Sequence, residues 1–233
     1  MNTNQKDVPL VLKMKELLSS VHGIEQCMLL GLTGTIASGK TTVAEMFTQC
    51  GACSIDFDIL SRKVVEPGCK AFEQIVDFFG EQILQPDGTL NRQQLSGIVF
   101  KDPEKRKHLE QFTHPQIAIE FINQLENIIT KKPNAIIQII IPLLIEQNLQ
   151  PLFHKLIVVY APQETLIKRL MKRNNIFEKD ALRMIHSQIS IDEKVQYADF
   201  VINNGKDRAH TYHQVDKLWE KLKSIQNCPS ELV

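Results

Sequence analysis

Residues 34–41 carry two glycines, a lysine and a threonine at the spacing of a phosphate-binding loop. They read G-T-I-A-S-G-K-T and fit the pattern G-x-x-x-x-G-K-[ST] at every position. An apolar run at 28–32 precedes them, and a helix-like stretch at 42–49 follows. In that setting the loop amides and the helix N-terminus surround phosphate groups. A chance match in a glycine-containing turn is the alternative, but the flanking pattern favours a loop that binds ATP or GTP.

The residue types in this loop predict its contacts with the nucleotide. Lys40 is expected to reach the β and γ phosphates, and the Thr41 hydroxyl to ligate Mg²⁺. Because phosphoryl transfer depends on positioning and charge neutralisation, Lys40 is also a candidate catalytic residue. The residues expected to surround the nucleotide are Gly34, Thr35, Ile36, Ala37, Ser38, Gly39, Lys40, Thr41 and Thr42.

The rest of the chain narrows the class of nucleotide-binding protein. A GTPase needs an N-K-x-D segment after a strand, and the sequence has none. A motor or AAA-type ATPase needs a longer core than 233 residues provide. A long helical stretch after the second strand and a basic helix late in the chain favour a small-molecule kinase. In such a kinase the loop holds ATP, the insertion holds the acceptor, and arginines of a lid close over the phosphates.

Five short apolar runs must position these residues. They lie at 28–33, 53–57, 135–141, 156–160 and 200–203, and none alternates cleanly between apolar and polar residues. Continuous apolar strands separated by helices predict a parallel sheet covered on both faces. The expected fold class is therefore α/β, a P-loop three-layer sandwich around a five-stranded parallel sheet.

The predicted helices fall into separate groups. Those at 69–79, 92–100, 102–112 and 115–129 lie between the second and third strands and indicate an inserted helical subdomain. Asp102 and Pro103 form a helix start, with Asp at the N-cap and Pro at N1. Helices at 163–173, 178–188 and 206–225 lie around the last two strands, and a short one at 8–18 precedes the first strand.

The composition argues against several classes of function. The 27 basic residues balance 27 acidic residues, which argues against a general nucleic-acid or membrane-surface binder. No apolar run in the sequence reaches the roughly 18 residues that span a bilayer, and residues 1–27 do not resemble a secretory signal or a transit peptide. The five cysteines are odd in number and complete no metal-site pattern, so we expect free thiols and a cytoplasmic location. Nothing in the sequence implies an obligate protein partner.

Short segments spread along the chain form a set that few families share. They are G-L-T-G at 31–34, G-K-T-T at 39–42, I-D-F-D-I at 55–59, V-V-E-P-G at 64–68, G-T-L-N-R at 88–92, I-V-F at 98–100, T-H-P at 113–115, I-P-L-L-I-E at 141–146 and A-D-F-V-I at 198–202. From Met28 to the C-terminal helix the chain resembles the dephospho-coenzyme A kinase family. The resemblance implies a fold similar to nucleoside monophosphate kinases, with a helical CoA-binding insertion and a helical lid.

The activity implied by this resemblance is transfer of the ATP γ-phosphate, with Mg²⁺, to the ribose 3′-hydroxyl of dephospho-CoA. The products are CoA and ADP, and the reaction is the last step of coenzyme A biosynthesis. One alternative is a P-loop kinase of another small alcohol or nucleotide. The other is a catalytically inactive nucleotide-binding regulatory protein, against which the intact pair Asp56 and Asp58 argues.

The resemblance also implies the boundaries of the parts. A nucleotide-binding core would comprise residues 28–60 and 133–227, the acceptor-binding insertion 61–132, and the lid about 170–195. Residues 1–27 would form an N-terminal extension and residues 228–233 a tail. Because a P-loop protein can start at its first strand, we expect residues 1–27 to be dispensable for catalysis, or translation to begin at Met28.

The resemblance implies roles for charged residues outside the phosphate loop. Asp58 is the candidate general base for the acceptor hydroxyl, and Asp56 would orient the acceptor or contact Mg²⁺ through water. Alternatively, Asp58 caps a helix that begins near Ile59. Arg173 and Arg169 would reach the phosphates from the lid, unless they serve only as cations near a helix C-terminus.

Three further residues, Arg62, His114 and Glu146, are expected to bind the acceptor. The alternatives are a solvated surface cation for Arg62, a structural hydrogen-bond donor for His114, and a buried partner of a backbone N–H or an arginine for Glu146. Two loop positions depart from the family, which usually has glycine where Thr35 and Ala37 stand. Their Cβ atoms are tolerated if φ is negative there.

Overall fold

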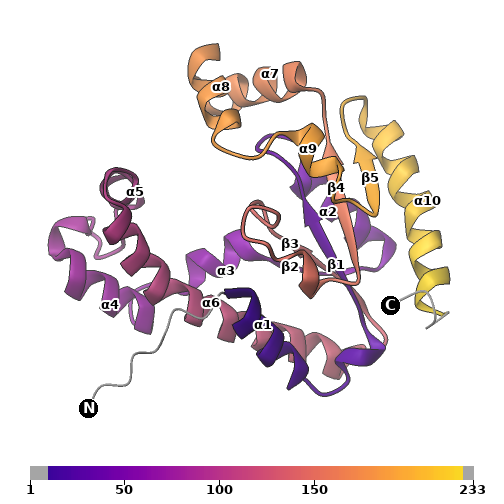
Figure 1. The fold of residues 1–233 in the computed structure, drawn as a ribbon, viewed down its shortest axis with the longest axis horizontal. Coiled ribbons are helices and arrows are strands. Elements are labelled where there is room, and N and C mark those ends of the chain that lie inside the picture. Colours follow the sequence, from indigo (N-terminus) through magenta and orange to yellow (C-terminus); the bar gives the residue numbers. More distant parts are fainter. Residues whose placement is uncertain (1–9, 228–233) are drawn as a thin grey trace. The chain divides into compact units, whose positions relative to one another are not determined.

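The computed structural model describes residues 10–227 and contains a sheet of five parallel strands (Figure 1). The prediction of an α/β fold with five parallel strands is confirmed. The strand order is β2-β3-β1-β4-β5. The strands are β1 (Met28–Thr33), β2 (Cys53–Asp56), β3 (Ile136–Ile140), β4 (Lys155–Tyr160) and β5 (Phe200–Asn203).

Helices cover the sheet because its strands are apolar on both faces. Every residue of β1 and β3 is buried. On one face α2 (Lys40–Cys50) and α10 (Arg208–Gln226) close a core that includes Phe47, Trp219 and Leu222. A second cluster joins Val158 of β4 to α7 (Gln163–Asn174), α8 (Glu178–His186) and α9 (Ile191–Val195). Because successive residues of a strand point to opposite faces, these two clusters lie on opposite sides of β4.

The chain divides into two compact units, of which one is helical and comprises Phe57–Leu125. The other contains the sheet and is built from the chain up to Asp56 and from Glu126 onward. The helical unit holds α3 (Phe57–Lys63), α4 (Lys70–Phe79), the short 3₁₀ helix η2 (Glu81–Ile83) and α5 (Arg92–Lys101). It has a core of its own, with Ile75, Ile83 and Leu95 among the buried side chains.

The helix α6 (Pro103–Lys131) differs from the sequence-based expectation of two helices at 102–112 and 115–129. It begins as predicted, with the Asp102 carboxylate accepting two backbone N–H bonds of the first turn. Pro115 then lies inside one continuous helix, although an interior proline costs about 3 kcal/mol. Apolar side chains are packed on both sides of the proline, among them Phe112 and Phe121. Packing over several turns therefore outweighs the local break.

The N-terminal extension is described from residue 10 onward and adds α1 (Leu10–Ser19) and the 3₁₀ helix η1 (Ile24–Gln26). Met14, Leu18 and Val21 are buried. The predicted helix started at residue 8, and its first two residues lie outside the described part of the chain, as does the tail at 228–233. Whether residues 1–27 are needed for catalysis stays a prediction.

The helices and the cysteines of the described residues bear on the expectations about membrane spans and free thiols. None of the helices between residues 10 and 227 combines the length and the apolar character that a membrane crossing needs. Cys27, Cys50, Cys53 and Cys69 are free thiols, as predicted. Cys228 lies outside the described residues.

Candidate active site

The phosphate loop, residues 34–39, connects the end of β1 to the start of α2. Gly39 has φ of 92° and stands at the N-cap of α2, so the N-terminus of this helix, where backbone amides need partners from outside the helix, opens onto the loop. A Cβ at Gly34 would lie 2.5 Å from the carbonyl oxygen of Val159. The Lys40 Nζ donates to the carbonyl oxygens of Gly34 at 2.9 Å and Thr35 at 3.2 Å. The loop therefore combines amides and an ammonium group, which suits an anion.

Ala37 adopts a left-handed backbone conformation, with φ of 65°. For a residue with a Cβ this conformation costs roughly 1–2 kcal/mol. The condition under which a Cβ is tolerated, a negative φ, is therefore not met at Ala37, although Thr35 is not among the residues with positive φ. Ala37 and Ile36 pack against the apolar cluster formed by β4, α7, α8 and α9. The Ala37 side chain is therefore packed against apolar groups although the Ala37 backbone is strained.

Asn204, the residue after β5, bonds the phosphate loop at Ser38. Its Nδ2 donates to the Ser38 carbonyl oxygen at 2.8 Å, and its Oδ1 accepts from the Thr211 hydroxyl at 3.0 Å. A Cβ at Gly39 would collide with the Asn204 amide. Arg169 of α7 donates to the Asn204 carbonyl oxygen at 2.7 Å and to the Ser38 carbonyl oxygen at 3.4 Å. The structure thus brings the predicted Arg169 to the phosphate loop, where it contacts loop backbone.

Gln188, just beyond α8, bonds the phosphate loop at Ile36. Its Oε1 accepts the backbone N–H of Ile36 at 2.9 Å. The next residue, Ile189, donates its backbone N–H to Glu146 at 3.2 Å. The segment after α8 is therefore attached both to the phosphate loop and to the chain that follows β3.

Glu146 forms an ion pair with Lys194 of α9, at 2.8 Å between Oε1 and Nζ. The Lys194 side chain is 0% exposed and that of Glu146 is 19% exposed. Lys194 also donates to the Pro142 carbonyl oxygen at 3.1 Å. Glu146 therefore has a backbone N–H and a buried cation as partners, which favours the structural alternative with lysine in place of arginine. A contact of Glu146 with the acceptor stays a prediction.

Asp56 ends β2 at the same edge of the sheet as the phosphate loop. Asp56 pairs in register with Ile140 of β3, and Ile140 with Leu32 of β1. Adjacent strands are about 4.8 Å apart, so the backbone of Asp56 lies roughly 10 Å from that of Leu32, two residues before the loop. This is the carboxyl edge, where open α/β sheets bind their ligands.

Asp58 lies in the helical unit, two residues after Asp56. Because α3 begins at Phe57, Asp58 is inside the first helical turn and not at the N-cap. The N-cap interpretation is therefore wrong, although a carboxylate in this turn still interacts favourably with the helix dipole. Asp58 is exposed. This residue is thus open to solvent.

Arg62 and His114 also belong to the helical unit. Arg62 is exposed in the last turn of α3, beside Lys63, whose Nζ pairs with Glu120 at 2.6 Å. His114 is half-buried in α6. Burial lowers the pKa of His114, and the nearby Glu110 opposes this shift. At neutral pH the imidazole is therefore a neutral hydrogen-bonding group.

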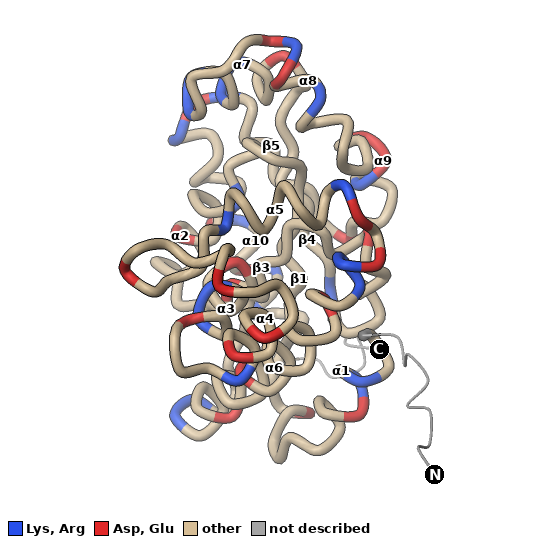
Figure 2. The backbone as a smooth tube through the Cα atoms, turned by 90° about the vertical axis from the view of Figure 1, so that its left-hand side faces the viewer, with Lys and Arg blue, Asp and Glu red and all other residues tan. Residues whose placement is uncertain are grey.

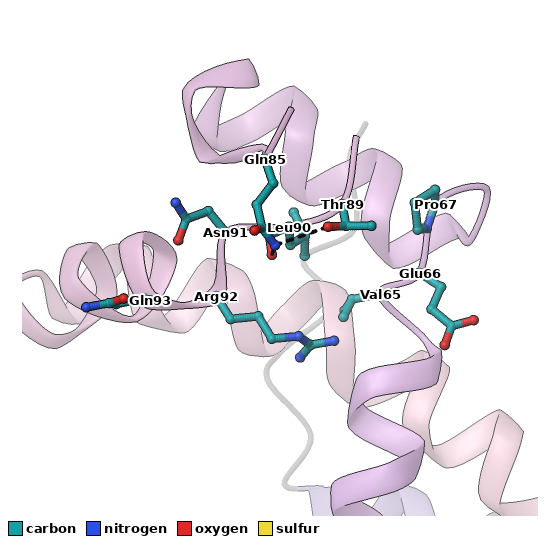
Figure 3. Close-up of a pocket in the computed structure, with 9 residues that line it drawn as sticks. All are labelled: Val65, Glu66, Pro67, Gln85, Thr89, Leu90, Asn91, Arg92 and Gln93. Carbon is teal, nitrogen blue, oxygen red and sulfur yellow. Dashed lines mark hydrogen bonds between the residues drawn. The ribbon is translucent and has the colours of Figure 1, made fainter. Parts of the chain in front are cut away.

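A pocket of about 460 Å³ opens inside the helical unit, between the turn after α3 and the turn before α5. Figure 3 shows Arg92 extending from the start of α5 toward Val65, while Gln85 and Thr89 line the opposite wall. Gln85 Nε2 donates to the Thr89 hydroxyl at 3.2 Å, and Arg92 Nη2 donates to the Arg62 carbonyl oxygen at 3.2 Å. The volume is within the range of small-ligand pockets.

Arg173 lies one turn beyond Arg169 on α7. It is exposed, and its Nε donates to the Asn174 side chain at 2.9 Å. Figure 2 shows basic positions gathered on α7, which carries Lys168, Arg169, Lys172 and Arg173. Arg169 contacts the phosphate loop, whereas Arg173 contacts its neighbour in the chain. The phosphate contact predicted for Arg173 stays a prediction.

The residues expected near Mg²⁺ fit an ion that is bound mainly through phosphate groups. Thr41 is exposed in the first turn of α2, and Asp56 is half-buried at the end of β2. Among residues 10–227 no three His, Cys, Asp or Glu side chains gather as a metal site. Mg²⁺ commonly takes one or two protein ligands and completes its shell with phosphate oxygens and water.

Comparison with known proteins identifies the family. A family model described as dephospho-CoA kinase matches residues 28–209. The chain belongs to the dephospho-CoA kinase family. A relative with that name from Listeria monocytogenes is 47% identical over 193 residues, covering 83% of this chain and 96% of the relative. The resemblance inferred from the sequence motifs is thus confirmed.

Solved structures agree with this family and with the fold. The chain aligns with a dephospho-CoA kinase from Campylobacter jejuni at a TM-score of 0.57 and 32% identity, covering 84% of this chain and 98% of the other. It aligns with the protein TT1252 from Thermus thermophilus at a TM-score of 0.75 and 28% identity, over 84% and 97% of the two chains. This member of the dephospho-CoA kinase family therefore has the expected P-loop kinase fold.

Sequence reasoning did not single out three residues that the structure places at the candidate site or its supports. They are Arg92, Gln188 and Lys194. Arg92 lies in one of the segments that carry the family resemblance, so a signal was present. No local sequence pattern marks a side chain that bonds the phosphate loop, because its partner in the loop is more than a hundred residues away in the chain.

Proposed function

We propose that this member of the dephospho-CoA kinase family transfers the γ-phosphate of ATP to the ribose 3′-hydroxyl of dephospho-CoA, giving CoA and ADP. The observation that carries the proposal is the family match over residues 28–209, which includes an intact phosphate loop. The position of that loop at the carboxyl edge of a parallel sheet supports it further.

The reaction forms one bond to phosphorus and breaks another. The acceptor hydroxyl oxygen attacks Pγ, the bond from Pγ to the β,γ-bridging oxygen breaks, and ADP leaves with the electron pair. The hydroxyl proton passes to the carboxylate of Asp58, which is exposed and therefore able to approach a bound acceptor. Asp56, at the end of β2, would orient the acceptor.

Charge on the transferring phosphate is neutralised by cations around the loop. Lys40 already lies across the loop and would bind the β and γ phosphates. Thr41, and Asp56 through water, would hold Mg²⁺, which would supply further positive charge when it is bound with ATP. Arg173 would add a guanidinium from the lid, and Arg169 would position the loop through Ser38.

The acceptor is proposed to bind on the helical unit. Dephospho-CoA carries a diphosphate and a long amide-bearing arm, so its site needs both cations and hydrogen-bonding groups. Arg62 and Arg92 offer guanidinium groups, and the 460 Å³ pocket offers the amide of Gln85 and the hydroxyl of Thr89. His114, neutral in its half-buried position, would donate or accept a hydrogen bond.

The parts of the chain then have distinct roles. The sheet unit binds ATP, the helical insertion predicted at 61–132 binds the acceptor, and the lid at about 170–195 closes over the phosphates. Closure excludes water and so limits hydrolysis of ATP. A cytoplasmic location, where thiols stay reduced, agrees with the free cysteines.

The test measures ADP formation by the full chain with ATP, Mg²⁺ and one acceptor at a time. Dephospho-CoA is compared with AMP, shikimate and gluconate. Asp58→Asn should lower kcat by about 10²–10⁴-fold, because general-base catalysis is lost while the fold is kept. Asp77→Asn is the matched control, because Asp77 is an exposed carboxylate of the same unit, in α4.

Turnover with dephospho-CoA alone, lost with Asp58→Asn and kept with Asp77→Asn, supports both the substrate and the base. Turnover with another acceptor would keep the kinase chemistry and contradict the substrate. Binding of ATP without turnover of any acceptor would contradict the proposed activity.

A further inference from the structure

The phosphate loop is held at two peptide groups by residues far away in the chain. The N–H of Ile36 donates to the Gln188 side chain at 2.9 Å. The C=O of Ser38 accepts from Asn204 at 2.8 Å and from Arg169 at 3.4 Å. Gln188 lies in the predicted lid, whereas Asn204 follows the last strand. The loop is thus attached both to the lid and to the sheet.

Ala37 lies between these two attached groups and is the strained residue of the loop. A residue with a Cβ at φ of 65° remains in that conformation only when its surroundings hold it there. Asn204 fixes Ser38 on one side, and Gln188 bonds Ile36 on the other, where Ile36 and Ala37 also pack against an apolar cluster. A glycine at this position would adopt the same φ without strain.

Gln188 is itself kept in place by its neighbours. Ile189 donates its backbone N–H to Glu146, and Lys194 forms a buried ion pair with the same carboxylate. Gln188 is half-buried, and its side-chain oxygen bonds the phosphate loop at the Ile36 N–H.

We infer that Gln188 is a positioning residue, which ties the nucleotide-binding conformation of the phosphate loop to the lid because position 37 is alanine. The inference rests on the proposed binding of ATP by this loop. When the bond from Gln188 to Ile36 is absent, Ala37 relaxes from the left-handed region and the loop amides no longer converge. The nucleotide must then restore the strained conformation, and its affinity falls.

The test is a double-mutant cycle on nucleotide affinity in the full chain. Binding of ATP and of ADP, each with Mg²⁺, is measured by calorimetry for the wild type, Gln188→Met, Ala37→Gly and the double variant. Methionine keeps the length of the side chain and removes the acceptor oxygen. Gln196→Met is the matched control, because Gln196 is an exposed glutamine that also follows a lid helix.

Gln188→Met should weaken nucleotide binding about tenfold in the chain that keeps Ala37, the size of a lost hydrogen bond together with released strain. In the Ala37→Gly background the same change should weaken binding about threefold or less. Gln196→Met should leave the affinity unchanged. Gln188→Asn, which withdraws the acceptor by one methylene group, should repeat the pattern of Gln188→Met.

Two results would overturn the inference. One is an equal loss of affinity on Gln188→Met in the wild-type and Ala37→Gly backgrounds, and the other is unchanged affinity in Gln188→Met. Thermal unfolding of each variant separates these results from a general loss of folded protein, which would not depend on the residue at position 37. A wild-type chain that binds neither nucleotide contradicts the proposed function itself, so the two failures are distinguishable.

Discussion

Replacing Lys194 by methionine should lower the free energy of unfolding by about 3 kcal/mol, because it leaves the carboxylate of Glu146 without its buried cation. Lys194 is fully buried and bonds both oxygens of Glu146 as well as the Pro142 carbonyl. Breaking a buried ion pair by removing one partner typically costs about 3–5 kcal/mol. The lower end applies here because Glu146 is 19% exposed and water can solvate the remaining charge.

The complementary change, Glu146→Gln, should cost about 4 kcal/mol, because it leaves the ammonium group fully buried. In the double variant, Lys194→Met with Glu146→Leu, both charges are replaced by apolar groups of similar size. Its cost should be only about 1–2 kcal/mol, mainly for the lost acceptor of the Ile189 N–H. The double variant is therefore expected to be more stable than either single variant.

Urea unfolding followed by circular dichroism measures these free energies, and an unchanged m-value shows that the same surface is exposed in each variant. The reasoning is refuted if the double variant loses the sum of the two single losses, since independent sites give additive effects. The same proteins test the acceptor role of Glu146. If Glu146 binds dephospho-CoA, the KM for this substrate should rise in Glu146→Gln and not in Lys194→Met.

Three further predictions concern separate parts of the molecule. Lys40→Met should lower kcat about 10²–10⁴-fold in the ADP assay with little change in thermal unfolding, because its ammonium acts on the transferring phosphate; a change of about tenfold or less would contradict this role. The Nδ1 of His154 accepts the Leu29 N–H at 2.9 Å, and burial lowers the pKa of this imidazole. The stability that neutral His154 contributes is therefore present above about pH 6.5. It is lost as the pH falls toward the lower pKa of the folded state. His154→Asn, which keeps an acceptor and does not titrate, should reduce the fall of Tm between about pH 7 and about pH 5, and an unchanged slope would exclude His154 as the cause. Deletion of residues 1–27 should leave kcat within about twofold but lower Tm by roughly 5–15 °C, because buried apolar side chains of the extension are lost; a matching loss of kcat would show that the extension acts in catalysis.

The sequence predicted the sheet well because its signals are local. Each strand is a short apolar run, and each run appears as a strand with ends shifted by at most one residue. The phosphate loop was equally predictable, because its glycines, lysine and threonine act within eight consecutive residues. The break expected at Pro115 was wrong for the opposite reason, since packing far from the proline keeps α6 continuous.

The surroundings of the loop could not be predicted in this way. Nothing near Gln188 in the sequence distinguishes it from Gln196, yet the Gln188 side chain accepts the Ile36 N–H of the phosphate loop at a separation of 152 residues. Asn204 reaches Ser38 across 166 residues. Lys194 looks like a surface lysine in a short helix with two acidic neighbours, and becomes buried only because α9 meets the end of β3.

The backbone of Ala37 shows why these distant contacts matter for the chemistry. A motif search treats position 37 as free, because the pattern fixes only its glycines, lysine and threonine. The fold nevertheless demands a left-handed residue there, and alanine meets that demand at a cost of roughly 1–2 kcal/mol. That cost is offset by groups that hold the neighbouring peptides, among them Gln188 and Asn204, together with the packing of Ala37 against an apolar cluster. An alanine in place of glycine therefore makes the nucleotide-binding loop depend on the lid, a dependence that no local pattern of residues contains.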